Sequence, residues 1–207
     1  MNEVFETVNN LTEEQKIIAS FWDDNPNVST YSGHFMYFSQ KMTPGGHWLA
    51  ITSKVAEVKK LSIIETAEAF ALTSIAMSDA FKCCWKEKYR FNTIRPVTVI
   101  NEKINPSWNP YIQTPPFPEY TSGHAVISAA AAEVMTDIFG DNISYTDTSE
   151  TEFGIAPRSF TSVRKAAEEA GISRVYGGIH YKHSCDIGNA EGKLVGQLVI
   201  QRLHMKK

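Results

Sequence analysis

The sequence predicts an all-α protein, a helical bundle of about six helices, and three observations carry this prediction. Apolar residues recur with the period of a helix through most of the 207-residue chain. Two four-residue capping boxes mark helix starts. The composition, with 43% hydrophobic and 21% charged residues, is that of a globular protein. Because a chain of this length can bury a sizeable core, we expect a single domain over residues 1–207.

The N-terminal part contains two of the predicted helices. A capping box, Thr-Glu-Glu-Gln at residues 12–15, predicts a helix that runs toward Trp22. The turn-rich residues 23–33 are expected to form a loop. After a Thr-Pro-Gly-Gly stretch, the next helix is expected to start near His47 and to continue to Lys60.

A long central helix follows. The box Ser-Ile-Ile-Glu at residues 62–65 opens a helix that is apolar on most sides, as expected for the central helix of a bundle. Pro96 ends this helix at or before Arg95, because the residue before a proline avoids the α region. Residues 101–120 contain five prolines and are the main irregular stretch. Loops of this length in compact domains are often functional.

The C-terminal half contains three further helices. Ser122 is expected to cap an alanine-rich helix that ends near Gly140. Residues 141–157 are polar and acidic, and a short strand is predicted at 143–146. A helix is predicted over 159–171, with the glycine at its end in the C′ position.

The last predicted helix spans residues 185–203. Its three glycines, Gly188, Gly192 and Gly196, stand four residues apart and therefore share one face. Since this face carries no side chains, we expect a neighbouring helix to approach it closely inside the bundle.

Charge and hydropathy exclude several classes of function. The formal net charge of −3 provides no positive field for nucleic acid, so no nucleic-acid partner is expected. The most apolar stretch, residues 63–84, is interrupted by three acidic residues, so no membrane span is expected. Three cysteines cannot form a complete disulfide framework. No secretory signal opens the chain, and we expect a soluble protein of unknown compartment; a periplasmic or secreted location would suit a piece of a longer precursor.

Three short segments carry residues typical of an anion site. Residues 88–95 begin and end with a cation, residues 122–124 read Ser-Gly-His at a helix start, and residues 173–180 read Ser-Arg-x5-His with two glycines. Guanidinium groups match the oxygens of a tetrahedral oxyanion, a lysine adds a point charge, and a helix N-terminus adds free N–H groups. Each segment alone is typical of a surface or a helix cap. Together, in this order, they predict a site for a phosphate-shaped ligand.

These motifs resemble a known signature. Lys-x6-Arg-Pro, Ser-Gly-His and Ser-Arg-x5-His look like the three-part motif shared by type 2 phosphatidic-acid phosphatases (PAP2) and vanadium-dependent haloperoxidases. Residues 115–125, Pro-Pro-Phe-Pro-Glu-Tyr-Thr-Ser-Gly-His-Ala, are very similar to the chloroperoxidase version of the second motif. The soluble bacterial haloperoxidase-like branch is therefore the closer match, and it implies a helical PAP2/haloperoxidase-like core.

The resemblance implies a role for each motif residue. The oxygens of bound vanadate or phosphate would be held by Lys88, Arg95, Ser122, Gly123 and Arg174. His180 would be the axial vanadium ligand, or in a phosphatase the nucleophile that becomes phosphohistidine. His124 would be the acid–base group. Trp85 and Phe117 would shape the halide side of the pocket, and Phe117 favours the chloroperoxidase type.

The expected function is that of a haloperoxidase-like enzyme, with vanadate as cofactor and with halide and hydrogen peroxide as small-molecule substrates. The first alternative is a PAP2-type acid phosphatase that acts on phosphomonoesters without a cofactor. The second is a non-catalytic phosphate-binding relative. A zinc hydrolase is a third alternative, because His180, His183 and Asp186 recur at helical spacing and His47 or His34 could complete a site.

Two features depart from the family pattern. The family motif carries an aspartate four residues after the histidine, where this chain has Ser184. Family members are also usually longer, with extra helices before the first motif. This difference in length suggests a fragment, a processed chain or a subunit that completes its fold by dimerising. The expected protein partner is therefore a second copy of the chain, in a homodimer. Asp79, on an otherwise apolar helix, is the predicted partner of Arg95 or Arg174.

Overall fold

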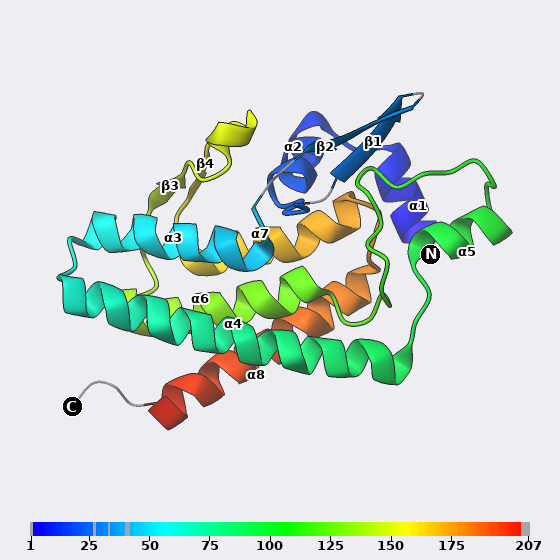
Figure 1. The fold of residues 1–207 in the computed structure, drawn as a ribbon. Coiled ribbons are helices and arrows are strands. Elements are labelled where there is room, and N and C mark those ends of the chain that lie inside the picture. Colours follow the sequence, from blue (N-terminus) through cyan, green and yellow to red (C-terminus); the bar gives the residue numbers. More distant parts are fainter. Residues whose placement is uncertain (1, 27, 33, 40–41, 204–207) are drawn as a thin grey trace.

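The computed structural model describes residues 2–26, 28–32, 34–39 and 42–203, and within them the protein is all-α, as predicted (Figure 1). The six predicted helices are α2 (Glu13–Phe21), α3 (Pro44–Lys59), α4 (Ile63–Phe91), α6 (Gly123–Phe139), α7 (Val163–Tyr176) and α8 (Lys182–Leu203). Both capping boxes form, at Thr12 before α2 and at Ser62 before α4. Two short helices were not predicted, α1 (Asn2–Asn9) and α5 (Pro96–Lys103).

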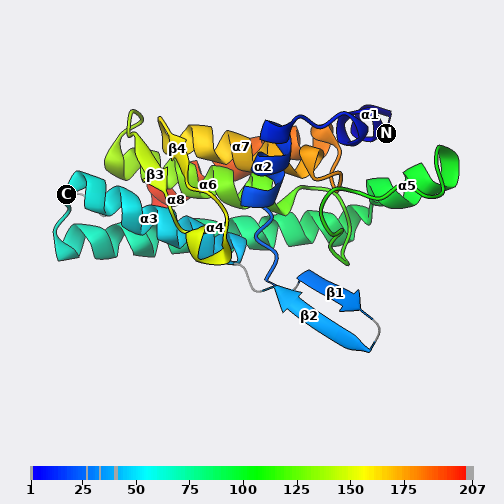
Figure 2. The same ribbon diagram turned by 90° about the horizontal axis from the view of Figure 1, so that it is seen from above.

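Four short strands form two antiparallel hairpins. β1 (Val28–Ser32) pairs with β2 (Phe35–Ser39), with Ser32 opposite Phe35, and β3 (Tyr145–Asp147) pairs with β4 (Arg158–Phe160). A single 3-10 turn, η1 (Thr151–Phe153), lies between β3 and β4. The β1–β2 hairpin projects away from the helices (Figure 2).

Several sequence-based boundaries were wrong. Part of the loop predicted at residues 23–33 is strand β1, and Gly33 lies outside the described residues. The helix predicted from residue 159 starts only at Val163, because the preceding residues pair with β3. This helix also runs past Gly171 to Tyr176, so Gly171 is no C′ residue. A Cβ there would lie 2.9 Å from the Asn189 side chain on α8, which shows close helix packing instead.

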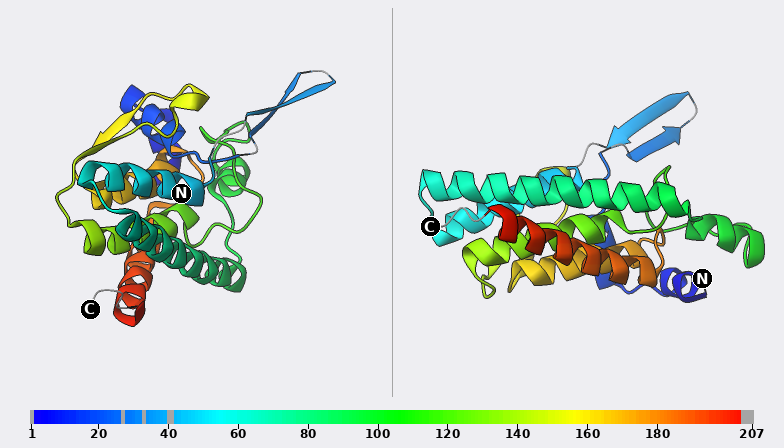
Figure 3. Two further views of the ribbon diagram at one scale, coloured as in Figure 1. Left: turned by 60° about the vertical axis from the view of Figure 1, so that its left-hand side comes forward. Right: turned by 90° about the horizontal axis from the view of Figure 1, so that it is seen from below.

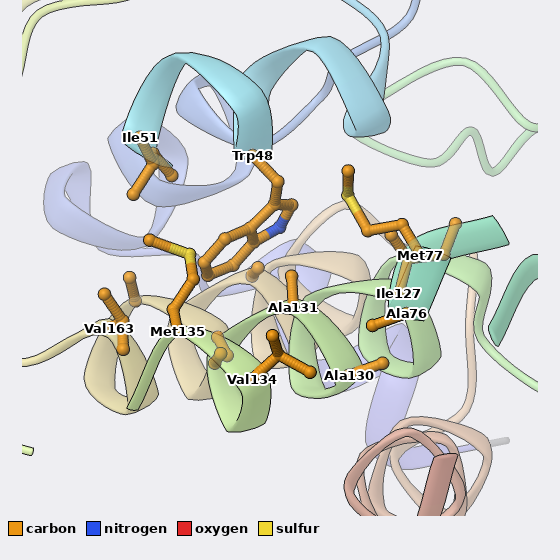
Figure 4. Packing of buried hydrophobic residues seen from close by; sticks show 14 of the residues in the cluster. Trp48, Ile51, Ala76, Met77, Ile127, Ala130, Ala131, Val134, Met135 and Val163 are labelled. Carbon is orange, nitrogen blue, oxygen red and sulfur yellow. The ribbon is translucent and has the colours of Figure 1, made fainter. Parts of the chain in front are cut away.

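Helix α6 forms the centre of the bundle, with α3, α4, α7 and α8 packed around it (Figures 1 and 3). Its four consecutive alanines, residues 129–132, are all buried. Trp48 of α3 lies across α6 near Ala131 and Met135 (Figure 4), and its indole N–H donates to Ser128 Oγ at 2.8 Å. The large ring thus fills the space that the small side chains of α6 leave open.

The glycine face of α8 lies against α6, as predicted. A Cβ on Gly188 would lie 3.0 Å from the Ala125 Cβ, and one on Gly196 would lie 2.7 Å from the Glu133 Cβ. A Cβ on Gly192 would overlap the carbonyl oxygen of Val126. This close approach brings the segment before α8 next to the start of α6. In the described part of the chain, no helix is long and apolar enough to cross a membrane.

Candidate active site

The three predicted segments meet around one cavity of about 480 Å³. Of the predicted site residues, its lining includes Trp85, Phe117, Gly123, His124, Arg174 and His180. Lys88, Arg95 and Ser122 are buried beside this lining. The cavity lies where the start of α6, the end of α7 and the proline-rich loop after α5 come together.

A glycine turn places Arg174 and His180 side by side. Helix α7 ends at Tyr176, and Gly178 then takes φ = 78°, a conformation that favours glycine. The chain reverses here, so the His180 N–H donates to the carbonyl of Arg174 at 3.3 Å. Gly178 is therefore the glycine of the third motif whose conformation folds the histidine back over the arginine. Gly177 keeps a helical φ of −64°, but a Cβ on it would lie 2.6 Å from the Ile112 side chain.

His180 is buried and held at both ring nitrogens. Nδ1 lies 2.8 Å from Glu119 Oε1, and Nε2 lies 3.0 Å from Arg95 Nη1. A carboxylate accepts and a guanidinium donates, so Nδ1 carries the proton and Nε2 presents its lone pair. Burial, with Arg95, Lys88 and Arg174 nearby, lowers the pKa of His180 well below its usual value. The ring is thus neutral, the form that can bind a metal or attack phosphorus.

Sequence reasoning missed the role of Glu119. Its carboxylate is 1% exposed, accepts from His180 and from the Tyr181 N–H, and on its other oxygen accepts from Ser184 Oγ at 2.8 Å. Burial raises its pKa, and these hydrogen bonds oppose the rise. The sequence does contain a signal for this role, because Glu119 is an acidic residue within the proline-rich motif. However, only the fold brings that motif to the residues that follow His180.

Lys88 holds the proline-rich loop. Its Nζ donates to the carbonyls of Pro118 and Glu119, each at 2.9 Å, and of Thr121 at 2.5 Å. Burial lowers the pKa of this lysine to about 8. All three ammonium protons are therefore engaged with the loop, and the loop in turn carries the wall of the cavity.

The two arginines differ in how many of their N–H donors are hydrogen-bonded to the protein. Arg95 donates to the carbonyls of Phe117 and Ile179, and burial lowers its pKa to about 10. Arg174 donates from Nη1 to the carbonyl of Trp22, while its buried Nε has no hydrogen-bond partner among the described residues. Arg174 is thus the cation with a donor left for a ligand.

His124 is the first member of a buried series in which histidines and carboxylates alternate. Its Nε2 lies 3.4 Å from Asp24 Oδ2, and Asp24 Oδ1 lies 2.8 Å from Nδ1 of His47. Nε2 of His47 lies 2.9 Å from Asp147. Between two carboxylates, the pKa of His47 rises to about 10 against the opposing effect of burial, and the pKa of Asp24 is lowered. Burial, with Arg174 nearby, lowers the pKa of His124.

Aromatic rings form a further part of the cavity lining. Trp85 stacks on Phe81 with ring centres 3.8 Å apart, and Phe117 lies 5.0 Å from Trp85. Phe117 also lies beneath the Arg95 guanidinium at 5.2 Å. The cavity therefore has a polar side with His124, Arg174 and His180, and an apolar side beside Phe117.

The residues present fit a compact oxyanion such as vanadate or phosphate. The buried Arg174 Nε has no hydrogen-bond partner among the described residues, and the buried Ser122 hydroxyl has only the weakly polar Cys185 thiol beside it. Buried groups of this kind require an explanation. Ser122 stands at the N-cap of α6, yet its side chain makes no cap bond, contrary to the sequence-based prediction. An anion with several acceptor oxygens would satisfy both groups and offset the buried positive charge.

Other predicted groupings do not form. Asp79 is half-exposed and pairs with Lys82 at 3.3 Å, because it lies on a face of α4 turned away from the site. Of the proposed zinc ligands, His183 and Asp186 are exposed, and Asp186 pairs with Lys182, whereas His180 is buried at the cavity. His34 is exposed, and His47 is buried behind Asp24 rather than in the cavity lining.

The chain is similar to several known proteins. A vanadium chloroperoxidase from Curvularia inaequalis is 28% identical over 113 residues, which are 46% of this chain and 19% of that protein. The crystal structure of a bacterial vanadium-dependent iodoperoxidase is 46% identical, with a TM-score of 0.90 over 98% of this chain and 48% of the other. A bacterial vanadium-dependent chloroperoxidase in its holo form, 19% identical, shares the fold with a TM-score of 0.76 over 97% of this chain and 46% of the other.

The chain spans less than half the length of each of these relatives. Residues 68–206, well over half of the chain, match the family described as the VCPO second helical-bundle domain. This match includes most of α4 and all of α6, α7 and α8, and it contains the three motifs. The chain therefore belongs to the family of the second helical-bundle domain of vanadium haloperoxidases.

Proposed function

We propose that this chain provides the vanadate site of a haloperoxidase that oxidises halide with hydrogen peroxide. The observation that carries the proposal is a neutral, buried His180 whose Nε2 lone pair lies among three cations beside the cavity. In the overall reaction, halide, hydrogen peroxide and one proton give hypohalous acid and water. The halide loses two electrons and the peroxide gains them.

Vanadate would be held by His180 Nε2 together with the donors of Arg174, Ser122 and the start of α6. When bound, it supplies the Lewis-acid centre that activates hydrogen peroxide toward the halide. Arg95 now donates to His180 Nε2, so its guanidinium has to turn from that nitrogen toward the anion. Lys88 supports the site indirectly in this arrangement, because it holds the loop that carries Phe117 and Glu119.

His124 is the proposed proton-transfer group. Its ring lines the cavity and Asp24 stands behind it at 3.4 Å, so a proton taken up from the cavity would be stabilised by a carboxylate. Because burial keeps His124 neutral, it is ready to accept a proton from hydrogen peroxide and to return it to the leaving oxygen.

The aromatic wall suits a weakly hydrated halide. Trp85 and Phe117 exclude water from the side of the cavity beside Lys88 and Arg95, whose charges attract an anion. We propose iodide as the first substrate to test, because the iodoperoxidase is 46% identical to this chain. Iodide is also the halide most easily oxidised.

Phosphomonoester hydrolysis is the second candidate, and one observation favours it. Absence of the family aspartate at position 184 argues against a nucleophilic histidine, but Glu119 supplies a carboxylate to His180 Nδ1 at 2.8 Å. The same atoms could therefore support a phosphohistidine, with His124 protonating the leaving alcohol.

One experiment separates these functions. Purified protein is assayed for iodide and bromide oxidation with hydrogen peroxide, with and without orthovanadate, and for p-nitrophenyl phosphate hydrolysis. Vanadate-dependent oxidation supports the haloperoxidase, whereas hydrolysis inhibited by vanadate supports the phosphatase. Phosphate binding without turnover would indicate a non-catalytic relative.

The variant His180→Ala is expected to abolish whichever activity is found, because it removes the proposed ligand or nucleophile. His183→Ala is the matched control, since this histidine is three residues away and exposed. Unchanged turnover in His180→Ala would overturn both functional proposals.

A further inference from the structure

We infer that Glu119 is the positioning carboxylate of His180, and that it replaces the aspartate which the family motif carries at the position of Ser184. The consequence for vanadate binding depends on the proposed function, but the inference about the orientation of the imidazole does not. A carboxylate supplied by Glu119 explains how this chain tolerates a serine at a position where the family motif has an acid.

The geometry of the carboxylate supports this role. Glu119 Oε1 lies 2.8 Å from His180 Nδ1 and 3.1 Å from the Tyr181 N–H, while Oε2 lies 2.8 Å from Ser184 Oγ. Both oxygens are thus occupied, and three contacts from one short segment define the plane of the carboxylate. His180, Glu119 and Ser184 are each at most 3% exposed, so water does not compete for these bonds.

The effect on His180 follows from hydrogen-bond chemistry. A carboxylate that accepts from Nδ1 keeps the proton on that nitrogen and leaves the lone pair on Nε2, which is the atom beside Arg95. Without Glu119, the imidazole could adopt the other tautomer or rotate. Its lone pair would then no longer be presented to the ligand among the cations.

Ser184 and Glu119 form a matched pair. The serine hydroxyl donates to the carboxylate, and an acid at residue 184 would instead bring a second buried negative charge against Glu119. Two carboxylates at this distance disfavour each other strongly in a buried site. We therefore expect an acid at residue 184 to be harmful while Glu119 is present and beneficial once Glu119 is removed.

The test uses four variants of the whole chain: Glu119→Gln, Glu119→Ala, Ser184→Asp and the double variant Glu119→Ala/Ser184→Asp. Asp186→Asn is the control, because that acid is exposed and pairs with Lys182. The first readout is the tautomer of His180, measured by ¹⁵N NMR on protein without vanadate. The second is the affinity for orthovanadate and for inorganic phosphate, measured by calorimetry. Circular dichroism and thermal unfolding identify variants that do not fold.

The wild type is expected to hold the proton on Nδ1. Glu119→Ala should weaken this preference, because only the Arg95 N–H at Nε2 then supports it. It should also bind the oxyanions about 10- to 100-fold more weakly, the usual effect of losing such a partner. The double variant should regain the tautomer and most of the affinity, whereas Ser184→Asp alone should lose both. Glu119→Gln keeps the shape of the side chain without its charge, so it should fold and show an intermediate loss.

An unchanged tautomer together with an unchanged oxyanion affinity in Glu119→Ala and Glu119→Gln would overturn the inference. A double variant no better than Glu119→Ala would overturn the exchange with residue 184. Failure of the proposed function is a separate result: a wild type with the expected tautomer but no vanadate-dependent halide oxidation would leave this inference standing.

Discussion

At the scale of single residues, the site is organised by how its buried charges are paired. Lys88 and Arg95 use their donors to hold loop carbonyls, whereas Arg174 keeps a buried donor without a partner. Glu119 and Asp24 each hold a histidine. Arg174 therefore already has a donor for the proposed ligand, whereas Arg95 has to give up its bond to His180 before it can reach that ligand.

Arg174 provides the first prediction at this scale. Arg174→Ala should weaken binding of orthovanadate or phosphate by about 1.5–3 kcal/mol, because a buried charged hydrogen bond is lost. Calorimetric titration measures the difference. Arg90→Ala is the control, since Arg90 is exposed near the end of α4. Equal affinities of wild type and Arg174→Ala would contradict a ligand-binding role.

His47 provides a prediction about pH. Its pKa rises from 6.5 to about 10 in the folded protein because it lies between the carboxylates of Asp24 and Asp147, with Glu150 also close by. The stability from this pairing is fully present below pH 6.5 and is lost as the pH rises toward 10.

Denaturant unfolding of wild type and His47→Gln at several pH values checks this. At pH 6 the variant should be less stable by about 3–5 kcal/mol, since two buried carboxylates lose their charged partner. The difference should shrink toward pH 10. A difference that stays constant with pH would show that His47 is not charged in the folded protein.

Much of the site could be predicted from residue types and spacing. His124, Arg174 and His180 line one cavity, as the three motifs predicted, and Trp85 and Phe117 form one wall of it. The partners of the two histidines could not be predicted in this way. Asp24 and Glu119 lie far from them along the chain, and only close packing of separate elements reveals such pairs.

At the scale of elements, short sequence motifs predicted a helix correctly where residues within the motif itself stabilise the helix end. The capping boxes before α2 and α4 satisfy N–H groups within one turn, so their effect is visible in four residues. The eight-residue helices α1 and α5 depend instead on tertiary packing, because short helices are marginal alone. The three-residue strands β3 and β4 exist only as partners of each other.

The contact between α6 and α8 gives a prediction for this scale. Gly192→Ala should destabilise the protein by about 1–3 kcal/mol, because the new methyl group would overlap the carbonyl of Val126 and backbone cannot move aside cheaply. Gly45→Ala is the matched control in α3, where a Cβ meets nothing within 4 Å. The control should gain up to about 1 kcal/mol from the helix propensity of alanine. Similar unfolding midpoints for the two variants would argue against the close approach.

At the scale of the whole molecule, several large apolar side chains are exposed on α4 and α8. Ile63 and Ile64 on α4 are 88% and 81% exposed, and Leu194 on α8 is 67% exposed. These two helices pack against each other (Figure 3), and the longer relatives contain chain that this sequence does not. The homodimer expected from the sequence predicts that a second copy of this chain covers exposed apolar residues such as these.

Light scattering over a range of concentrations tests this prediction. The wild type should show the mass of a dimer that dissociates on dilution, and Leu194→Glu should shift it toward the monomer, because a charge would be buried in the interface. Asn142→Glu adds the same charge at an exposed position in the loop between α6 and β3 and should change nothing. A monomeric wild type at all concentrations would contradict the homodimer.

The sequence by itself determined the helical fold class, the six main helices and the residue types of the proposed anion site. These features depend on periodicity, capping and motif spacing, which act over a few turns of chain. Tertiary structure alone decided which acid serves which histidine, which cation keeps a free donor, and that Asp79 takes no part. These outcomes depend on burial and on distances of about 3 Å between separate elements, where charges interact strongly and a shift of one side chain changes the partner.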